Sequence, residues 1–115
     1  MAITAIFPVG IVSVTLKPLY QWDRGHTLEI HMSEIAPRVE VHYSYPGIDE
    51  AIACTCTIAD GVARSSIPDV CFEQSQPITA WVCVVSSTQG RTLKKITIPV
   101  IQRTMPPRKA LEVNV

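Results

Sequence analysis

The chain has 115 residues, of which 47% are hydrophobic and 17% charged, and ten basic residues balance ten acidic ones. A chain of this length is expected to form one domain around one core. Because the net charge is zero and no basic stripe is present, the composition argues against a nucleic-acid-binding protein.

The N-terminal segment carries no charge between Ala2 and Leu16. It contains Pro8 and Gly10, has no basic residue ahead of it, and is shorter than a membrane-spanning helix requires. We therefore expect buried strands here, without a signal peptide or membrane contact, in a protein that is made in the cytoplasm.

Short segments in which apolar and polar residues alternate follow one another along the chain, separated by Pro, Gly and Asp-Gly. This period-2 pattern predicts strands, and no segment has a sustained helical period. The predicted fold class is all-β: an antiparallel two-sheet sandwich of about seven to eight strands, immunoglobulin-like or jelly-roll-like. The expected strands are residues 2–7, 11–16, 26–32, 38–44, 51–58, 62–67, 78–87 and 91–101, with a helical turn within 69–75.

Three hairpins are predicted from their connecting residues. Asp60-Gly61 supplies the positive φ angles of a tight turn. The 88–90 connection offers Gly90 for a left-handed bulge position. The third hairpin joins 26–32 to 38–44 through residues 33–37, where a proline marks the strand boundary.

The third hairpin also predicts a register, because the apolar residues of both strands must share one buried face. On the outer face, His31 would then lie opposite Glu40, and Glu29 opposite His42. A neighbouring carboxylate favours imidazolium, so we expect a mild response to acid. The inward-facing set is Leu28, Ile30, Met32, Val39, Val41 and Tyr43.

The four cysteines, Cys54, Cys56, Cys71 and Cys83, lack the paired C-x-x-C spacing of structural zinc sites. As strand neighbours, Cys54 and Cys56 would be about 6.6 Å apart, which is too far for a disulfide. We interpret all four as free thiols that pack in the core.

The acid and imidazole group of the predicted hairpin could also hold Zn²⁺ or Mn²⁺. Paired charges across an exposed hairpin are nevertheless ordinary in β-sheets, so we expect no metal and no cofactor. The sequence contains no Gly-x-Ser-x-Gly elbow, phosphate-binding glycine loop or His-Glu-x-x-His motif, and we therefore expect no enzymatic activity.

Two regions are candidates for binding. Aromatic side chains can stack on sugar rings or anchor an interface, and a ligand platform could be formed by Tyr20, Trp22 and Tyr45. The sandwich is expected to end at residue 103, and residues 104–115 begin as a Pro-rich basic stretch that we expect to be extended. Apolar residues predicted to contact a partner in this tail are Met105, Leu111, Val113 and Val115.

Several blocks of the sequence resemble a known family. The segments are LYQWDRG at 19–25, LEI at 28–30, VEVHYS at 39–44, ITAWV at 78–82 and ITIPVIQR at 96–103. They look like successive blocks of a small β-sandwich domain of phages of Gram-positive bacteria, similar to the N-terminal domain of the baseplate upper protein. The resemblance covers residues 11–103.

This resemblance implies a virion structural protein that docks onto other virion proteins. Longer relatives continue after the block at 96–103 into receptor-binding or fibre modules, whereas twelve residues follow here. A tail or baseplate accessory protein and a capsid decoration protein are both compatible, and we expect a homo-oligomer. The alternative is a carbohydrate-binding module that recognises a glycan of the host surface.

Overall fold

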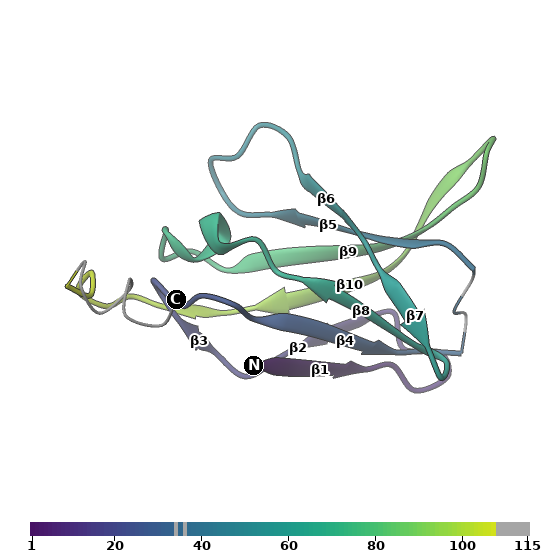
Figure 1. The fold of residues 1–115 in the computed structure, drawn as a ribbon, viewed down its shortest axis with the longest axis horizontal. Helices are drawn as coiled ribbons and strands as arrows, with labels where there is room; N and C mark the ends of the chain where they lie inside the picture. The colour runs from purple at the N-terminus through teal and green to yellow at the C-terminus, as the bar shows by residue number, and fades with distance from the viewer. Residues whose placement is uncertain (34, 36, 108–115) are drawn as a thin grey trace.

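The structure is a computed structural model that describes residues 1–33, 35 and 37–107. The described chain is all-β, as predicted, with eleven strands and one 3₁₀ turn, η1, in Figure 1. The strands are β1 (Ala2–Ile6), β2 (Ser13–Thr15), β3 (Leu19–Tyr20), β4 (Thr27–His31), β5 (Val39–Ser44), β6 (Ile52–Thr55), β7 (Thr57–Ala59), β8 (Val62–Ser66), β9 (Ile78–Val85), β10 (Gly90–Ile98) and β11 (Val100–Ile101), and η1 is Asp69–Phe72.

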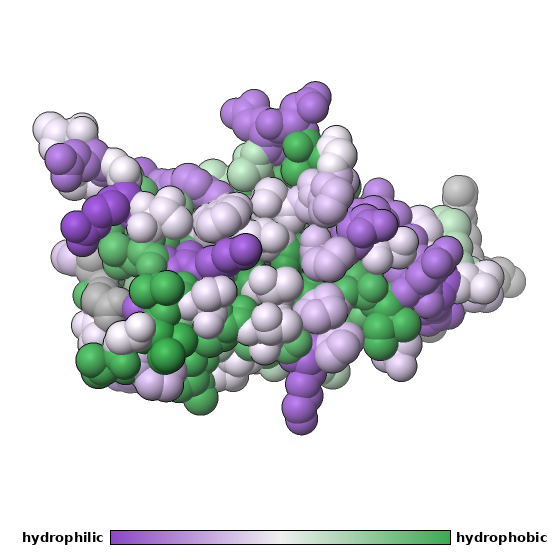
Figure 2. Space-filling view, turned by 180° about the vertical axis from the view of Figure 1, so that it is seen from behind, coloured by the Kyte–Doolittle hydropathy of each residue, from purple (hydrophilic) through white to green (hydrophobic). Residues whose placement is uncertain are grey.

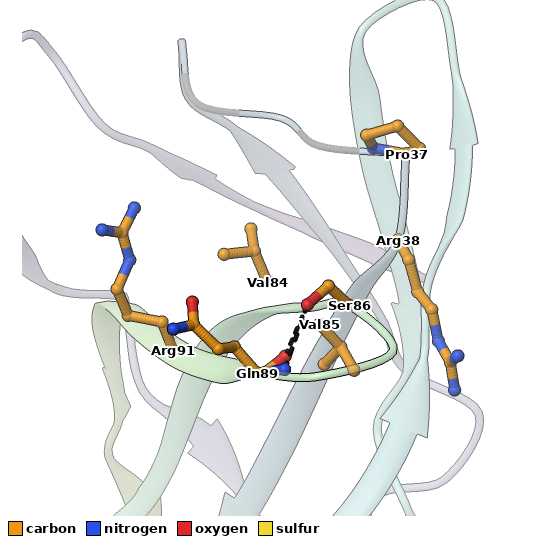
Figure 3. A pocket seen from close by; sticks show the side chains of 7 residues that line it. All are labelled: Pro37, Arg38, Val84, Val85, Ser86, Gln89 and Arg91. Carbon is orange, nitrogen blue, oxygen red and sulfur yellow. Dashed lines mark hydrogen bonds between the residues drawn. The ribbon is translucent and has the colours of Figure 1, made fainter.

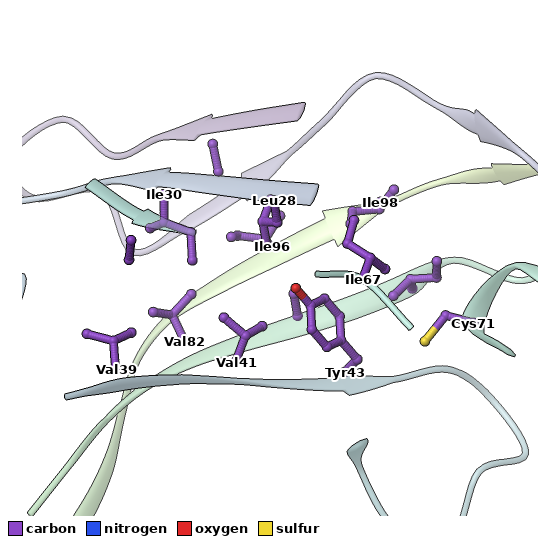
Figure 4. Close-up of a cluster of buried hydrophobic side chains, with 14 of the residues drawn as sticks. Leu28, Ile30, Val39, Val41, Tyr43, Ile67, Cys71, Val82, Ile96 and Ile98 are labelled. Atoms are coloured by element: carbon purple, nitrogen blue, oxygen red, sulfur yellow. The ribbon is translucent and has the colours of Figure 1, made fainter. Parts of the chain in front are cut away.

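The strands form three sheets. A four-stranded sheet has the order β1-β4-β8-β7, a five-stranded sheet the order β2-β10-β9-β5-β6, and β11 pairs with β3 in a small third sheet. Alternate residues of the two large sheets are buried in one cluster between them, which Figure 4 shows. The inward-facing set predicted from alternation is confirmed, since Leu28, Ile30, Val39, Val41 and Tyr43 are fully buried and Met32 is 8% exposed.

The predicted hairpin between β4 and β5 is wrong. β4 pairs with β1 and β8, whereas β5 pairs with β6 and β9, so the two strands lie in different sheets. His31 is therefore not opposite Glu40. Alternation shows which face of a strand is buried, but it does not show which strands are neighbours. Two strands that face each other across a core bury the same side chains as two neighbouring strands of one sheet would.

The acid and imidazole pairs form along the strands instead of across them. His42 Nε2 lies 3.1 Å from Glu40 Oε1, and His31 Nε2 lies 3.7 Å from Glu29 Oε1. Residues two apart on one strand project from the same face, and this geometry brings each imidazole to its carboxylate.

The prediction of purely antiparallel sheets is also wrong. β1 runs parallel to β4, β2 parallel to β10, and β3 parallel to β11. These pairs join segments far apart in the sequence, so no tight turn fixes their direction and no turn signal could reveal it.

The eight expected strands become eleven for three reasons. The expected strand 51–58 divides at Cys56 into β6 and β7, where the chain passes from the five-stranded to the four-stranded sheet. The expected strand 91–101 divides at Pro99, which has no N–H to donate. The short strand Leu19–Tyr20 was not predicted.

The turns follow the prediction in part. Asp60 (φ 53°) and Gly61 (φ 74°) form the tight turn between β7 and β8. The β9–β10 hairpin forms, but Gly90 is not left-handed, and the register shift lies between Thr92 and Lys94. The η1 turn confirms the helical turn expected within 69–75. None of the described helical segments could cross a membrane.

Candidate functional site

Two of the predicted binding residues, Trp22 and Met105, line the same pocket. It has a volume of about 320 Å³ and lies where the β3–β4 connection, η1 and the chain after β11 meet. Sequence reasoning assigned these residues to separate functions, a ligand platform and a partner contact. The described residues that line it are Trp22, Asp23, Arg24, Asp69, Glu73 and Met105.

The connection that carries Trp22 is held by hydrogen bonds. Trp22 has a φ of 72°, a conformation that costs energy for a residue with a side chain, and its N–H donates to the carbonyl oxygen of Phe72 at 2.7 Å. Asp23 Oδ2 accepts from the Tyr20 N–H at 3.3 Å and lies 2.9 Å from Nε2 of the buried His26. The indole ring is thus presented by a fixed backbone.

The rim of this pocket is mainly acidic. Asp69 Oδ1 accepts a hydrogen bond from the Gly25 N–H at 3.0 Å, and Asp69 Oδ2 lies 3.8 Å from Arg24 Nε. With Glu73 and Asp23, the described residues of the lining carry three carboxylates and one guanidinium. An aromatic ring beside such groups can hold a ligand that offers hydroxyl or ammonium donors.

The other predicted residues lie elsewhere. Tyr20 is 53% exposed, and Tyr45 packs against the core cluster after β5. Neither is among the residues that line the Trp22 pocket. Leu111, Val113 and Val115 lie outside the described residues.

Sequence reasoning missed Trp81, which lies on the outer face of the five-stranded sheet. Its Nε1–H donates to Ser44 Oγ at 3.3 Å, and Lys95 Nζ lies 5.5 Å from its ring centroid. The signal was available, because Trp81 falls between the inward-facing residues Ala80 and Val82 of one alternating segment.

A series of contacts between polar side chains lies beside Trp81 on the same face of the sheet. Cys83 Sγ lies 3.6 Å from Nδ1 of His42, whose Nε2 contacts Glu40, and Glu40 Oε2 lies 3.5 Å from Arg38 Nη2. Cys83 itself is 4% exposed. The described residues contain no group of three or more His, Cys, Asp or Glu side chains that could hold a metal ion.

The four cysteines are free thiols, as predicted, but the expected core packing holds in part: Cys71 belongs to the core cluster, and the partly buried Cys54 and Cys56 pack against it. Burial raises the pKa of Cys56 and of Cys71 to about 11, and it also raises the pKa of Cys54. A protonated thiol is therefore the stable form of these three side chains at neutral pH.

A second pocket, of about 490 Å³, opens beside the β9–β10 hairpin, and Figure 3 shows its side chains. The Ser86 hydroxyl donates to the carbonyl oxygen of Gln89 at 3.3 Å, which closes the hairpin loop. Among the described residues, Arg38 and Arg91 line this pocket with Val84, and Arg38 also lies 3.5 Å from the Glu40 carboxylate.

Among the described residues, the largest exposed group of aliphatic side chains lies at the end of β1 and on the connection from β1 to β2. We call Ile6, Val9, Ile11 and Val12 the 6–12 surface, and their exposed fractions are 63%, 92%, 43% and 61%. Figure 2 shows hydrophobic side chains gathered at this end of the molecule. No other described segment carries four exposed large aliphatic residues within seven positions.

The backbone under the 6–12 surface is held by contacts with a buried lysine. The ammonium group of Lys94, a residue that is 6% exposed, donates to the carbonyl oxygen of Ile11 at 2.8 Å and lies 5.3 Å from the ring centroid of Phe7. The Ile11 N–H donates to the carbonyl oxygen of Pro8 at 3.0 Å. Lys94 alternates with the buried residues Ile96 and Ile98 of β10, so its side chain points inward and contacts the connection from inside the sandwich.

Comparison of the chain with protein-family models gives no match, and comparison with curated proteins gives none.

Proposed function

We propose that this protein is a structural component of a bacteriophage particle and that it works by docking onto other protein subunits. The role would be that of a tail or baseplate accessory protein or of a capsid decoration protein. The observation that carries the proposal is the 6–12 surface, and the sequence blocks that resemble a virion sandwich domain support it.

The 6–12 surface has the energetic character of an interface. Single exposed aliphatic residues are normal, but a contiguous group of them usually marks a contact site. Removing a valine or isoleucine side chain from water contributes about 1.5–3 kcal/mol. Because Lys94 already fixes this connection, little conformational entropy would be lost on docking.

The position of the surface at the sheet edges supports the same proposal. β1 is an edge strand of the four-stranded sheet and β2 an edge strand of the five-stranded sheet. Edge strands carry backbone N–H and C=O groups that another chain can pair with. A partner could therefore combine apolar contacts with backbone hydrogen bonds.

We further propose that the two large sheets form an immunoglobulin-like sandwich. In that fold one sheet has the order ABED and the other contains GFC, extended by C′ in variable-type domains. The orders β1-β4-β8-β7 and β10-β9-β5-β6 correspond to these if β1 is A and β4 is B. The parallel pairing of β1 with β4 departs from the antiparallel pattern.

The proposal is tested by purifying phage particles from a culture that produces the chain. We expect quantitative mass spectrometry to detect the chain at a fixed copy number per particle, and immunogold labelling to place it on the particle surface. Absence of the chain from intact particles, with its presence in the soluble lysate, would contradict the proposal.

Carbohydrate binding is the second candidate, and the Trp22 pocket favours it. We expect titration with host wall polysaccharide to quench tryptophan fluorescence, and Trp22→Ala to abolish the change. Trp81→Ala serves as the matched control, because Trp81 lies outside this pocket. Equal quenching in both variants would exclude the pocket as the site.

A further inference from the structure

An apolar groove crosses the open side of the sandwich, between the edge strands of the two large sheets. It has a volume of about 570 Å³, and its lining comes from β1 and from the chain that runs from β2 into β3. Ile3, Leu16 and Leu19 are partly buried and pack against the core cluster. The groove is lined by Ile3, Thr4, Thr15, Leu16, Lys17, Pro18 and Leu19.

The backbone at both walls is available for pairing. The hydrogen bonds from Thr27 to Met1 and from Phe7 to His31 show that odd-numbered residues of β1 direct their backbone groups toward β4. Successive residues of a strand direct these groups to opposite sides, so Thr4 directs its N–H and C=O away from the sheet.

Backbone groups also alternate between the two sides of the strand at the other wall, which is formed by β2. Lys95 donates to the carbonyl oxygen of Val12, and Leu16 donates to that of Thr97, so even-numbered residues of β2 face β10. Thr15 therefore directs its backbone groups outward, as Thr4 does. An extended segment in the groove could pair with one edge while its side chains cover the apolar floor.

The sequence contains a segment with the required pattern. Residues 108–115, which lie outside the described part of the chain, read RKALEVNV, with aliphatic residues at Leu111, Val113 and Val115. Every second side chain of an extended segment points to the same side, so these three would share one face. Glu112 would lie on the other face and complements Lys17, which has no ion-pair partner within the described residues.

The direction of the chain favours the groove of another copy. β11 runs parallel to β3, with Val100 beside the groove residue Leu19 and Ile101 beside Tyr20. The segment after β11 therefore leaves the groove at Leu19 and runs away from Leu16. Figure 1 shows the described chain beyond β11 continuing away from β2. The stiff Pro106-Pro107 pair then opposes an immediate return.

We propose that the groove between β1 and β2 binds residues 108–115 of a second copy of this chain as an added strand. The inference rests on the proposed assembly function, and it assigns the groove between β1 and β2 to a second copy of the chain as its partner. Leu111, Val113 and Val115 cover the groove floor, and Glu112 pairs with Lys17.

The test measures the oligomeric state of the full chain by sedimentation velocity over a range of concentrations. Val113→Asp places a charge on the apolar face, and we expect the dissociation constant to rise at least about tenfold. Asn114→Asp is the matched control on the opposite face, with an expected change within about twofold. Equal melting temperatures of the variants will show that the sandwich is intact.

A charge exchange and a competing peptide add independent readouts. Glu112→Lys should weaken the oligomer, and combining it with Lys17→Glu should restore it. A synthetic peptide of residues 108–115 added to the wild-type chain should dissociate the oligomer and protect the Thr4 and Thr15 amides from hydrogen exchange.

The outcomes separate this inference from the proposed function. A Val113→Asp chain that keeps the wild-type oligomer, or a wild-type chain that is monomeric at all concentrations and leaves the peptide unbound, overturns the added strand. Both results leave the docking role of the 6–12 surface to be judged by incorporation into particles.

Discussion

The buried hydroxyl group of Tyr43 connects the two large sheets through one hydrogen bond. Tyr43, on β5, donates to Ser65 Oγ, on β8, at 2.9 Å, and the Ser65 hydroxyl donates to the carbonyl oxygen of Ser66 at 3.0 Å. Tyr43 is fully buried, and Ser65 is 2% exposed. Each hydroxyl group therefore satisfies the other in a region that water does not reach.

Removing either partner should destabilise the domain by a different amount. Tyr43→Phe deletes one hydrogen bond and leaves Ser65 bonded to Ser66, so we expect a loss of about 0.5–1.5 kcal/mol in the free energy of unfolding. Ser65→Ala leaves a buried phenol without an acceptor, with an expected loss of about 1–3 kcal/mol. Urea denaturation measures both, and a smaller loss in Ser65→Ala than in Tyr43→Phe would contradict this assignment.

The same side chains predict sensitivity to alkali. Burial raises the pKa of Cys56 and Cys71 to about 11 from 9.0, and it raises that of Tyr43 well above 10.0. The folded state then holds protons that the unfolded state has released, so stability is complete below pH 9 and falls as the pH rises. Tyr43→Phe should make the decline above pH 10 less steep, where the two thiols still contribute up to about pH 11, and leave the part between pH 9 and 10 unchanged, as measured by urea denaturation across this range.

At the scale of elements, the two neighbouring lysines of β10 have opposite roles. Lys94 fixes the 6–12 surface from inside, and Lys95 lies over Trp81 on the outer face. Lys94→Met should cost about 1.5–3 kcal/mol and accelerate hydrogen exchange of the amides in residues 9–12, because a charged donor is lost. Lys95→Met is the control, with an expected cost of at most about 1 kcal/mol and no change in that segment. Unchanged exchange in Lys94→Met would show that the connection is held by other contacts.

Turn geometry predicts a contrast between two glycines. Gly61 has a φ of 74°, which a residue with a side chain adopts at a cost of about 1–2 kcal/mol, although no atom would contact an added Cβ. Gly90 has no positive φ, and the space around it is equally open. Gly61→Ala should therefore lower the melting temperature, and Gly90→Ala should leave it unchanged or raise it slightly; equal effects would contradict the turn assignment.

At the scale of the whole molecule, the sequence indicates which residues are buried better than which strands are neighbours. Alternation predicted the inward-facing residues of β4 and β5 because burial is a property of each strand. It could not show that these strands belong to different sheets, nor that β1, β2 and β3 each run parallel to their partner. These pairings depend on contacts between distant segments, which leave no local signal.

The candidate binding surfaces likewise depend on contacts between distant segments, which the sequence does not reveal. Trp22 and Met105 were identified separately by residue type, but their shared pocket depends on the meeting of three distant segments. The absence of charge in segment 2–16 predicts buried strands, yet Val9 is 92% exposed, because the chain crosses between two sheets there. Composition alone does not distinguish an apolar segment that is buried from one that is available to a partner.

The most direct test of the docking role is incorporation of a surface variant into phage particles. The chain with Val9→Asp and Val12→Asp, matched by a Thr88→Asp control on the β9–β10 hairpin, is supplied to a phage that lacks its own copy, and the copies per purified particle are counted by mass spectrometry. We expect the double variant to melt like the wild type and to be absent from particles, while the control is incorporated normally. Incorporation of the folded double variant at the wild-type copy number would contradict the account.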